Sequence, residues 1–260
     1  MRIPVAVFLA SAALALSGCA GTIRDRIYQP AALAETPVQF TGEAPQDVNA
    51  RTADGLDLAG YYWPAKAGND TLVVYFHGNG YNQFVGAARA EPLRKGGHGV
   101  LVASYRGYGD NPGAPSEDGL FADAEAWMAK ARELAPGADI YLFGHSLGGA
   151  VALEMAARHE VAGVATLGTF ARLADQAPSI ARGILPDRYD NAAAIRRVSE
   201  PVFLLHGTED RVVALAAGEE LAEAASNATL VRLTGAGHQV DLAKIADRIW
   251  QAWENGLPES

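Results

Sequence analysis

One serine in this chain stands on a short turn between a strand-like run and a helix-like segment. The turn reads Gly144-His-Ser-Leu-Gly148, a G-x-S-x-G box. The apolar run 139–143 before it is typical of a buried strand, and the alanine-rich segment 150–158 after it is typical of a helix. A turn this tight lifts Ser146 above the sheet, and side chains at the flanking positions would clash there. The box therefore predicts the nucleophile turn of a serine hydrolase, with an acid and a histidine downstream in that order.

The rest of the chain alternates short apolar runs with helix-like segments. The predicted strands are 72–76, 100–104, 140–143, 164–167, 202–205 and 229–233. The predicted helices are 85–95, 118–134, 147–159, 215–225 and 240–255. This alternation predicts an α/β domain, with a doubly wound, mostly parallel sheet and helices on both faces. Ahead of it, the turn signal Asp54-Gly55 between strand-like runs 46–52 and 56–63 predicts a hairpin.

Candidate partners for Ser146 follow in the expected order. A serine hydroxyl is a weak nucleophile until a base takes its proton, and an acid must orient that base. Asp210 follows the predicted strand 202–205 and is our choice of acid, with Glu209 as the neighbouring alternative. His238 lies on a glycine-rich loop after the last predicted strand. The order serine, aspartate, histidine predicts a catalytic triad of Ser146, Asp210 and His238.

Two backbone N–H groups are predicted to bind the negatively charged oxygen that develops during attack. One belongs to Leu147, the first residue after the nucleophile, at the start of a helix. The other belongs to Asn79, in the glycine-containing loop 77–82 after the strand 72–76. The histidines within the motifs that we expect to have structural roles are His77, His145 and His206.

Several segments together resemble one known superfamily. They are Tyr75-Phe-His-Gly-Asn79, Tyr105-Arg-Gly-Tyr-Gly109, Gly144-His-Ser-Leu-Gly-Gly149, His206-Gly-Thr-Glu-Asp210 and Gly235-Ala-Gly-His238. The chain is similar over roughly residues 46–255 to the α/β-hydrolases. Within them it resembles a branch of small domains with little or no lid, which includes protein depalmitoylases and esterase- or peptidase-like bacterial members. The resemblance implies the same roles for Ser146, Asp210, His238, Asn79 and Leu147.

The resemblance implies ester cleavage through an acyl-enzyme, and it leaves thioesters and amides open because the superfamily uses one fold for many substrates. Serine at position 146 argues against dehalogenases and epoxide hydrolases, which resemble this fold but carry aspartate there. The alternative is a membrane-tethered binding or assembly protein that keeps the fold without turnover. The substrates of the depalmitoylases are not transferred, because this chain begins with an export-type segment.

The composition limits the classes of molecule that the protein is expected to bind. The net charge of −9 disfavours nucleic acid, so we expect a small-molecule or acylated substrate. Neither a Cys/His cluster nor an H-E-x-x-H motif occurs in the sequence, so we expect no metal and no cofactor. The sequence does not set the oligomeric state, and a monomer is our default expectation.

The N-terminus is typical of an exported chain. After Met1-Arg2, an apolar stretch over 3–16 leads to Leu16-Ser-Gly-Cys19, which contains the single cysteine. This pattern predicts a signal peptide over 1–18, because the apolar stretch is too short to span a membrane. It also resembles the bacterial lipoprotein box, which implies a lipid on Cys19 and anchoring to the inner or outer membrane with the domain extracytoplasmic. A plain secretory signal is the alternative.

Two further segments complete the predicted organisation. Residues 19–45 contain prolines and no clean periodicity, which predicts a lipidated tether before the hydrolase domain at 46–260. Residues 168–200 make an unusually long connection, with one predicted helix at 171–182 and a second that Asp190 caps. This connection is either a small lid insertion above the site or an ordinary crossover helix with a long loop.

Overall fold

A computed structural model describes residues 22–30 and 39–255 of the chain. The predicted signal segment 1–18, Cys19 and part of the predicted tether lie outside the described residues. Within the described ranges, no helix combines the length and the apolar character needed to cross a membrane.

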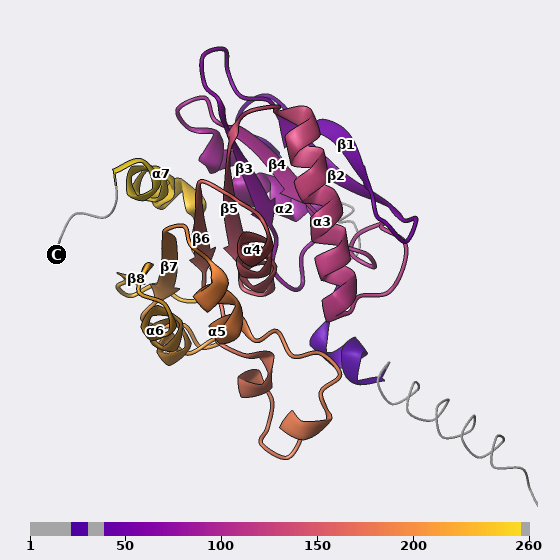
Figure 1. Ribbon diagram of the computed structural model, residues 1–260, viewed down its shortest axis with the longest axis vertical. Helices are drawn as coiled ribbons and strands as arrows, with labels where there is room; N and C mark the ends of the chain where they lie inside the picture. Colours follow the sequence, from indigo (N-terminus) through magenta and orange to yellow (C-terminus); the bar gives the residue numbers. More distant parts are fainter. Residues whose placement is uncertain (1–21, 31–38, 256–260) are drawn as a thin grey trace, which may run out of the picture.

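The core of the fold is one sheet of eight strands in the order β1-β2-β4-β3-β5-β6-β7-β8 (Figure 1). The strands are β1 (Gln46–Arg51), β2 (Asp57–Trp63), β3 (Thr71–Phe76), β4 (Gly99–Ala103), β5 (Asp139–His145), β6 (Gly163–Leu167), β7 (Val202–Gly207) and β8 (Ala228–Leu233). From β4 through β8 all neighbouring strands are parallel, whereas β2 pairs antiparallel with both β1 and β4. The predicted hairpin is present, because β1 and β2 pair around the turn that contains Gly55 at φ 90°.

Helices cover both faces of the sheet (Figure 1). They are α2 (Gln83–Ala90), α3 (Glu117–Leu134), α4 (Leu147–Arg158), α5 (Asn191–Ala194), α6 (Leu215–Ala224) and α7 (Ala246–Asn255). Leu72, Val74 and Phe76 of β3 join the buried cluster under α3 to α6. Val73 and Tyr75 join the cluster under α2 and α7. Successive residues of a strand face opposite sides of the sheet, and helices cover both sides. Residues on both sides therefore need to be apolar, which accounts for the continuous apolar runs. The predicted fold class is confirmed.

The long connection between β6 and β7 differs from its prediction. The predicted helix over 171–182 is wrong, because the structure has only two 3-10 turns there, Leu173–Gln176 and Arg182–Ile184. Ala171 is buried, but Ile180 is 91% exposed, so the apolar residues of the segment do not lie on one buried face that would stabilise a longer helix. The cap at Asp190 is present, because its carboxylate accepts a hydrogen bond from the N–H of Ala193 at the start of the short helix α5.

Part of the predicted tether is packed against the domain. Residues 22–27 are helical, and the next residue, Tyr28, is only 2% exposed. Arg24 donates two hydrogen bonds of 2.9 Å each to Asp187, in the connection between β6 and β7. Residues 22–30 therefore differ from the irregular tether expected there.

Candidate active site

Ser146 occupies a strained turn between β5 and α4. Its φ of 53° and ψ of −114° lie in a region that residues other than glycine rarely adopt. The packing around the turn is close on several sides. A Cβ added to Gly144 would approach the carbonyl oxygen of Gly148 to 2.3 Å, and one on Gly148 would approach the carbonyl oxygen of Phe76 to 2.0 Å. The two glycines of the box are thus required because backbone lies against backbone at both positions.

Asp210 and His238 are hydrogen-bonded. His238 Nδ1 lies 2.8 Å from Asp210 Oδ2, and because a carboxylate only accepts, Nδ1 carries the proton. This tautomer leaves the lone pair of Nε2 free to take a proton. Asp210 Oδ1 accepts hydrogen bonds from the N–H groups of Val212 and Val213, at 2.8 and 2.9 Å. The Asp210 side chain is fully buried, whereas the alternative acid, Glu209, is exposed.

Backbone contacts place His238 beside the serine turn. The N–H of Ser146 donates to the carbonyl oxygen of Leu167 at 2.8 Å, so the end of β6 borders the turn. The next residue, Gly168, has φ 61°, and a Cβ there would lie 3.0 Å from His238 Nδ1. On the other side of the serine, His145 Nε2 lies 3.1 Å from the carbonyl oxygen of His238. The structure therefore brings Ser146, Asp210 and His238 together at the carboxyl edge of the sheet, after β5, β7 and β8.

The two predicted oxyanion donors lie on neighbouring segments. Leu147 is the first residue of α4, where backbone N–H groups have no partner within the helix. Asn79 lies in the loop after β3, and this loop packs on the serine turn, because a Cβ on Gly78 would lie 2.7 Å from His145 Nδ1. The Asn79 side chain bonds to residues 27 and 29 and to Tyr108. Only its backbone can therefore serve the site.

The two histidines nearest to this loop are buried and neutral. Burial lowers the pKa of His77 to about 4 and, together with the proximity of His238, lowers the pKa of His145 to about 3. His77 Nδ1 donates to the carbonyl oxygen of Gly78 at 2.9 Å, so its Nε2 accepts from the hydroxyl of Ser104 at 3.1 Å. His145 packs between the rings of Tyr81 and His238. Neither can act as a base for Ser146 in this arrangement.

His206 lies closer to the candidate acid than its sequence position suggested. Its Nε2 donates to the carbonyl oxygen of Val213 at 2.9 Å and lies 3.6 Å from Asp210 Oδ2. His206 therefore holds the loop that carries Asp210. Sequence reasoning also missed Gly168, which lies at φ 61° and whose lack of a side chain leaves room for His238. A glycine directly after a strand was the only available signal.

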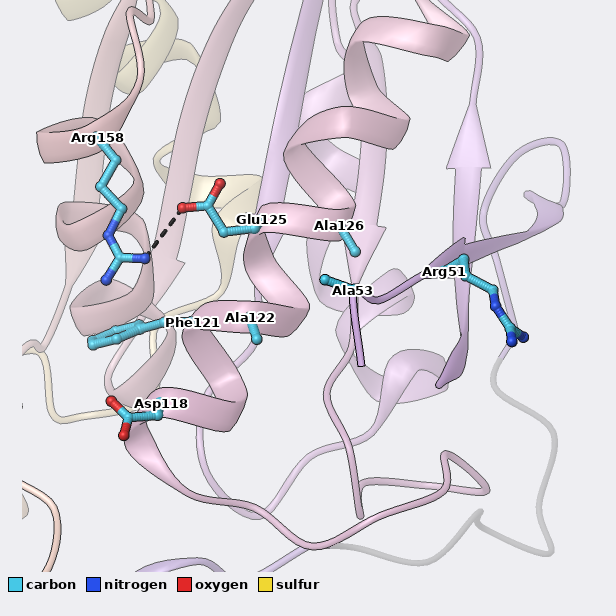
Figure 2. Close-up of a pocket in the computed structure, with 8 residues that line it drawn as sticks. All are labelled: Arg51, Ala53, Asp118, Phe121, Ala122, Glu125, Ala126 and Arg158. Carbon is cyan, nitrogen blue, oxygen red and sulfur yellow. Dashed lines mark hydrogen bonds and ion pairs between the residues drawn. The ribbon is translucent and has the colours of Figure 1, made fainter. Parts of the chain in front are cut away.

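A hollow of about 520 Å³ lies elsewhere on the molecule, between α3, β1 and the end of α4 (Figure 2). Arg158, which lines it, ends the helix that Leu147 begins, and at 1.5 Å per residue this end of α4 lies roughly 18 Å from the serine turn. Its Arg158 already pairs with Glu125 at 3.2 Å. Among the described residues, no group of His, Cys, Asp and Glu side chains could hold a metal ion.

Comparisons with known proteins agree with this fold. A family model described as the alpha/beta hydrolase fold matches residues 71–194. The chain is 36% identical over 225 residues to the uncharacterized protein Rv2307c of Mycobacterium tuberculosis, covering 83% of this chain and 80% of the relative. It is 30% identical over 221 residues to the alpha/beta hydrolase domain-containing protein 17C of Xenopus tropicalis, covering 81% of this chain and 70% of that protein.

A solved structure superposes on the same region. The esterase Pf2001 of Pyrococcus furiosus matches with a TM-score of 0.70 and 20% identity, covering 86% of this chain and 96% of the esterase. At 20% identity the superposition shows that the two proteins share a fold. The relatives that are at least 30% identical show the family to which the chain belongs. The chain therefore belongs to the α/β-hydrolase superfamily.

Proposed function

We propose that this protein is a serine hydrolase that cleaves carboxylic esters through an acyl-enzyme. The observation that carries the proposal is the hydrogen bond of 2.8 Å between His238 Nδ1 and Asp210 Oδ2, beside a serine held at φ 53°. A serine held in a strained turn, next to a histidine whose second nitrogen can accept a proton, is the arrangement that nucleophilic acyl transfer requires.

In the proposed reaction, Ser146 Oγ attacks the ester carbonyl while His238 Nε2 takes its proton. The backbone N–H groups of Leu147 and Asn79 bind the oxyanion of the tetrahedral intermediate. Protonated His238 then gives its proton to the departing alcohol, and an acyl group remains on Ser146. Water, activated by His238, releases the acid product. Asp210 keeps its charge throughout and stabilises the imidazolium.

Esters are the favoured substrates among those that this machinery can cleave. The structurally similar Pyrococcus furiosus protein is named as an esterase, and alcohols leave more readily than amines. Thioesters pass through the same tetrahedral intermediate and are therefore included in the proposed range. Amides are the less favoured class, because their amine leaving group departs less readily.

A fluorophosphonate probe tests the nucleophile directly, because it phosphonylates only a serine that a base has activated. We expect stoichiometric labelling of the protein and no labelling of Ser146→Ala. The second test is a series of p-nitrophenyl esters of increasing acyl length. For the esters that the wild type cleaves, kcat/KM should be at least about 10³-fold lower in Ser146→Ala and in His238→Ala. Equal labelling of the native protein and Ser146→Ala would contradict the proposal. Full labelling without turnover on esters and thioesters would favour the non-catalytic alternative.

We also propose that the protein is exported and carries a lipid on Cys19. The support is the apolar segment 3–16 and the position of the single cysteine after Leu-Ser-Gly. Metabolic labelling with a palmitate analogue in a bacterial host should mark the wild type and not Cys19→Ala. Absence of label on the wild type would leave a plain secretory signal as the explanation.

A further inference from the structure

The side chain of Asn79 holds the backbone of the N-terminal segment from two sides. Its Oδ1 accepts a hydrogen bond of 2.8 Å from the N–H of Gln29, and its Nδ2 donates one of 2.7 Å to the carbonyl oxygen of Ile27. Tyr108, which is fully buried, donates a third bond of 2.8 Å to the same Oδ1. The residue proposed to supply an oxyanion N–H is therefore fixed through its side chain by residues about fifty positions earlier in the chain.

Tyr28 lies between the two residues that bind Asn79 and anchors them both. It is 2% exposed, and its hydroxyl lies 3.0 Å from the hydroxyl of Tyr189. Arg24, one helical turn earlier, donates two hydrogen bonds of 2.9 Å each to Asp187, whose side chain is 2% exposed. Buried aromatic packing and a paired buried carboxylate are both costly to disrupt, so they anchor the segment firmly.

Tyr28 packs on the segment around Tyr189, whose backbone is strained and held by hydrogen bonds. Tyr189 has a φ of 40°, which is unusual for a bulky residue and persists only where neighbouring contacts impose it. Its N–H and that of Arg188 donate to the carboxylate of Glu117, at 2.7 and 2.6 Å. Glu117 begins α3, so the segment around Tyr189 is fixed to the body of the domain (Figure 1). A rigid surface of this kind can hold the segment 22–30 in one position.

The two residues before Asn79 in the loop after β3 accept hydrogen bonds from within the domain. The carbonyl oxygen of His77 accepts a bond of 3.1 Å from the hydroxyl of Tyr105, and that of Gly78 accepts one of 2.9 Å from His77 Nδ1. Asn79 differs from these two residues, because two of its three side-chain bonds join it to the N-terminal segment. Loss of that segment would leave the position of Asn79 less determined than the positions of its neighbours.

We propose that residues 22–30 are an N-terminal clamp that sets the oxyanion N–H of Asn79, with Tyr28 as its positioning residue. This inference rests on the proposed function, since it concerns the same site. An oxyanion donor acts mainly in the transition state, so a displaced donor lowers kcat and leaves KM nearly unchanged. Complete loss of one donor typically costs about 10²- to 10³-fold in rate. Releasing the clamp should cost roughly 10- to 100-fold, because Tyr108 still holds Asn79.

Tyr28→Ala in the otherwise intact chain tests the clamp, with Tyr28→Phe as the conservative variant. We expect Tyr28→Ala to lower kcat on a short p-nitrophenyl ester by roughly 10- to 100-fold, with KM within about twofold. Tyr28→Phe keeps the packing and should retain most of the activity. An alkylboronic acid, whose tetrahedral adduct with Ser146 places an oxygen between the oxyanion donors, should bind Tyr28→Ala more weakly by a similar factor.

Phe40→Ala is the matched control, because Phe40 also packs an aromatic ring on the domain, against Trp63, whereas the Asn79 side chain bonds to Ile27, Gln29 and Tyr108. It should lower the melting temperature and leave kcat unchanged. If Tyr28→Ala behaves like Phe40→Ala, the clamp is refuted. If Tyr28→Ala does not fold, Asn79→Ala is compared with Tyr108→Phe, because Asn79→Ala removes both bonds to the segment together with the bond from Tyr108, and Tyr108→Phe removes the last bond alone. Equal kcat values of these two variants would refute the clamp. If Ser146→Ala keeps full activity, the proposed function fails first, whatever Tyr28 does.

Discussion

At the scale of single residues, the serine turn shows how backbone packing fixes residue identity. Ser146 carries the strain of a positive φ, and the glycines around it make room for neighbouring backbone. Gly144 and Gly148 could be predicted from the sequence, because the G-x-S-x-G pattern encodes them. Gly168 could not be predicted, because the group that needs its space, His238, is far away in the sequence. Local patterns report local geometry, and contacts between distant segments leave little signal in a single sequence.

Gly148→Ala tests the backbone packing at the turn. Its Cβ would lie 2.0 Å from the carbonyl oxygen of Phe76, and backbone of a central strand cannot move aside as a flexible side chain could. We expect a loss of at least about 3 kcal/mol in the free energy of unfolding, measured by urea denaturation. Gly183→Ala is the matched control, because a Cβ there has nothing within 4 Å, and it should stay within about 0.5 kcal/mol. Equal effects of the two substitutions would contradict the packing argument.

At the scale of elements, one arginine joins α3 to the hairpin of β1 and β2. Arg106 Nη2 lies 2.7 Å from Asp123 of α3, and Arg106 Nη1 lies 2.9 Å from Asp54 in the hairpin turn. The Arg106 side chain is 11% exposed and that of Asp123 is fully buried. Burial raises the pKa of Asp123 although Arg106 opposes this shift. The pair thus fixes the loop after β4 to α3.

Asp123→Ala should destabilise the protein by about 3 kcal/mol, because it leaves a largely buried guanidinium with only one partner. Asp54→Ala removes a partner that is 53% exposed and should cost less than about 1 kcal/mol. Urea denaturation of both variants measures the difference. A loss at Asp54→Ala as large as that at Asp123→Ala would show that burial does not decide the contribution of each carboxylate.

The elements also differ in how well the sequence predicts them. Strands such as β3 and β5 are predicted well, because burial on both faces demands continuous apolar runs. The stretch 173–184 in the connection after β6 is not, because its Ile180 and Ile184 are 91% and 66% exposed and so do not mark a buried face. Periodicity predicts an element only where packing makes the apolar residues face one way.

At the scale of the whole molecule, the order of layers could be predicted, and the packing of the N-terminal segment could not. Alternating strands and helices permit few arrangements, so a doubly wound sheet follows from the pattern. Residues 22–30 lie among prolines and charged residues that resemble a linker. Their order depends on Asp187 and Tyr189, which belong to a distant connection. A segment that is ordered by partners far along the chain cannot be distinguished from a tether by its own composition.

The stability of the whole molecule should fall in mild acid because two histidines are buried uncharged. Burial lowers the pKa of His77 to about 4, below the ordinary value of 6.5 that the unfolded chain restores. Between these values the unfolded state binds a proton that the folded state does not, so the free energy of unfolding decreases as the pH falls. His145, with a pKa of about 3, adds in the same direction. The maximum slope is about 1.4 kcal/mol per pH unit for each histidine.

His77→Gln isolates one of these contributions. The amide of glutamine does not titrate, so the variant should lose less stability than the wild type between pH 7.5 and pH 5.0. The expected difference is about 1 to 2 kcal/mol, because most of that interval below pH 6.5 lies within the titration window of His77. Urea denaturation of both proteins at the two pH values measures it, and other groups that titrate in both proteins cancel in the comparison. An identical pH dependence of the two proteins would mean that His77 is protonated in the folded protein at pH 5.0 or is accessible to water. It would contradict the assignment of His77 as a buried, neutral imidazole that donates to the carbonyl oxygen of Gly78.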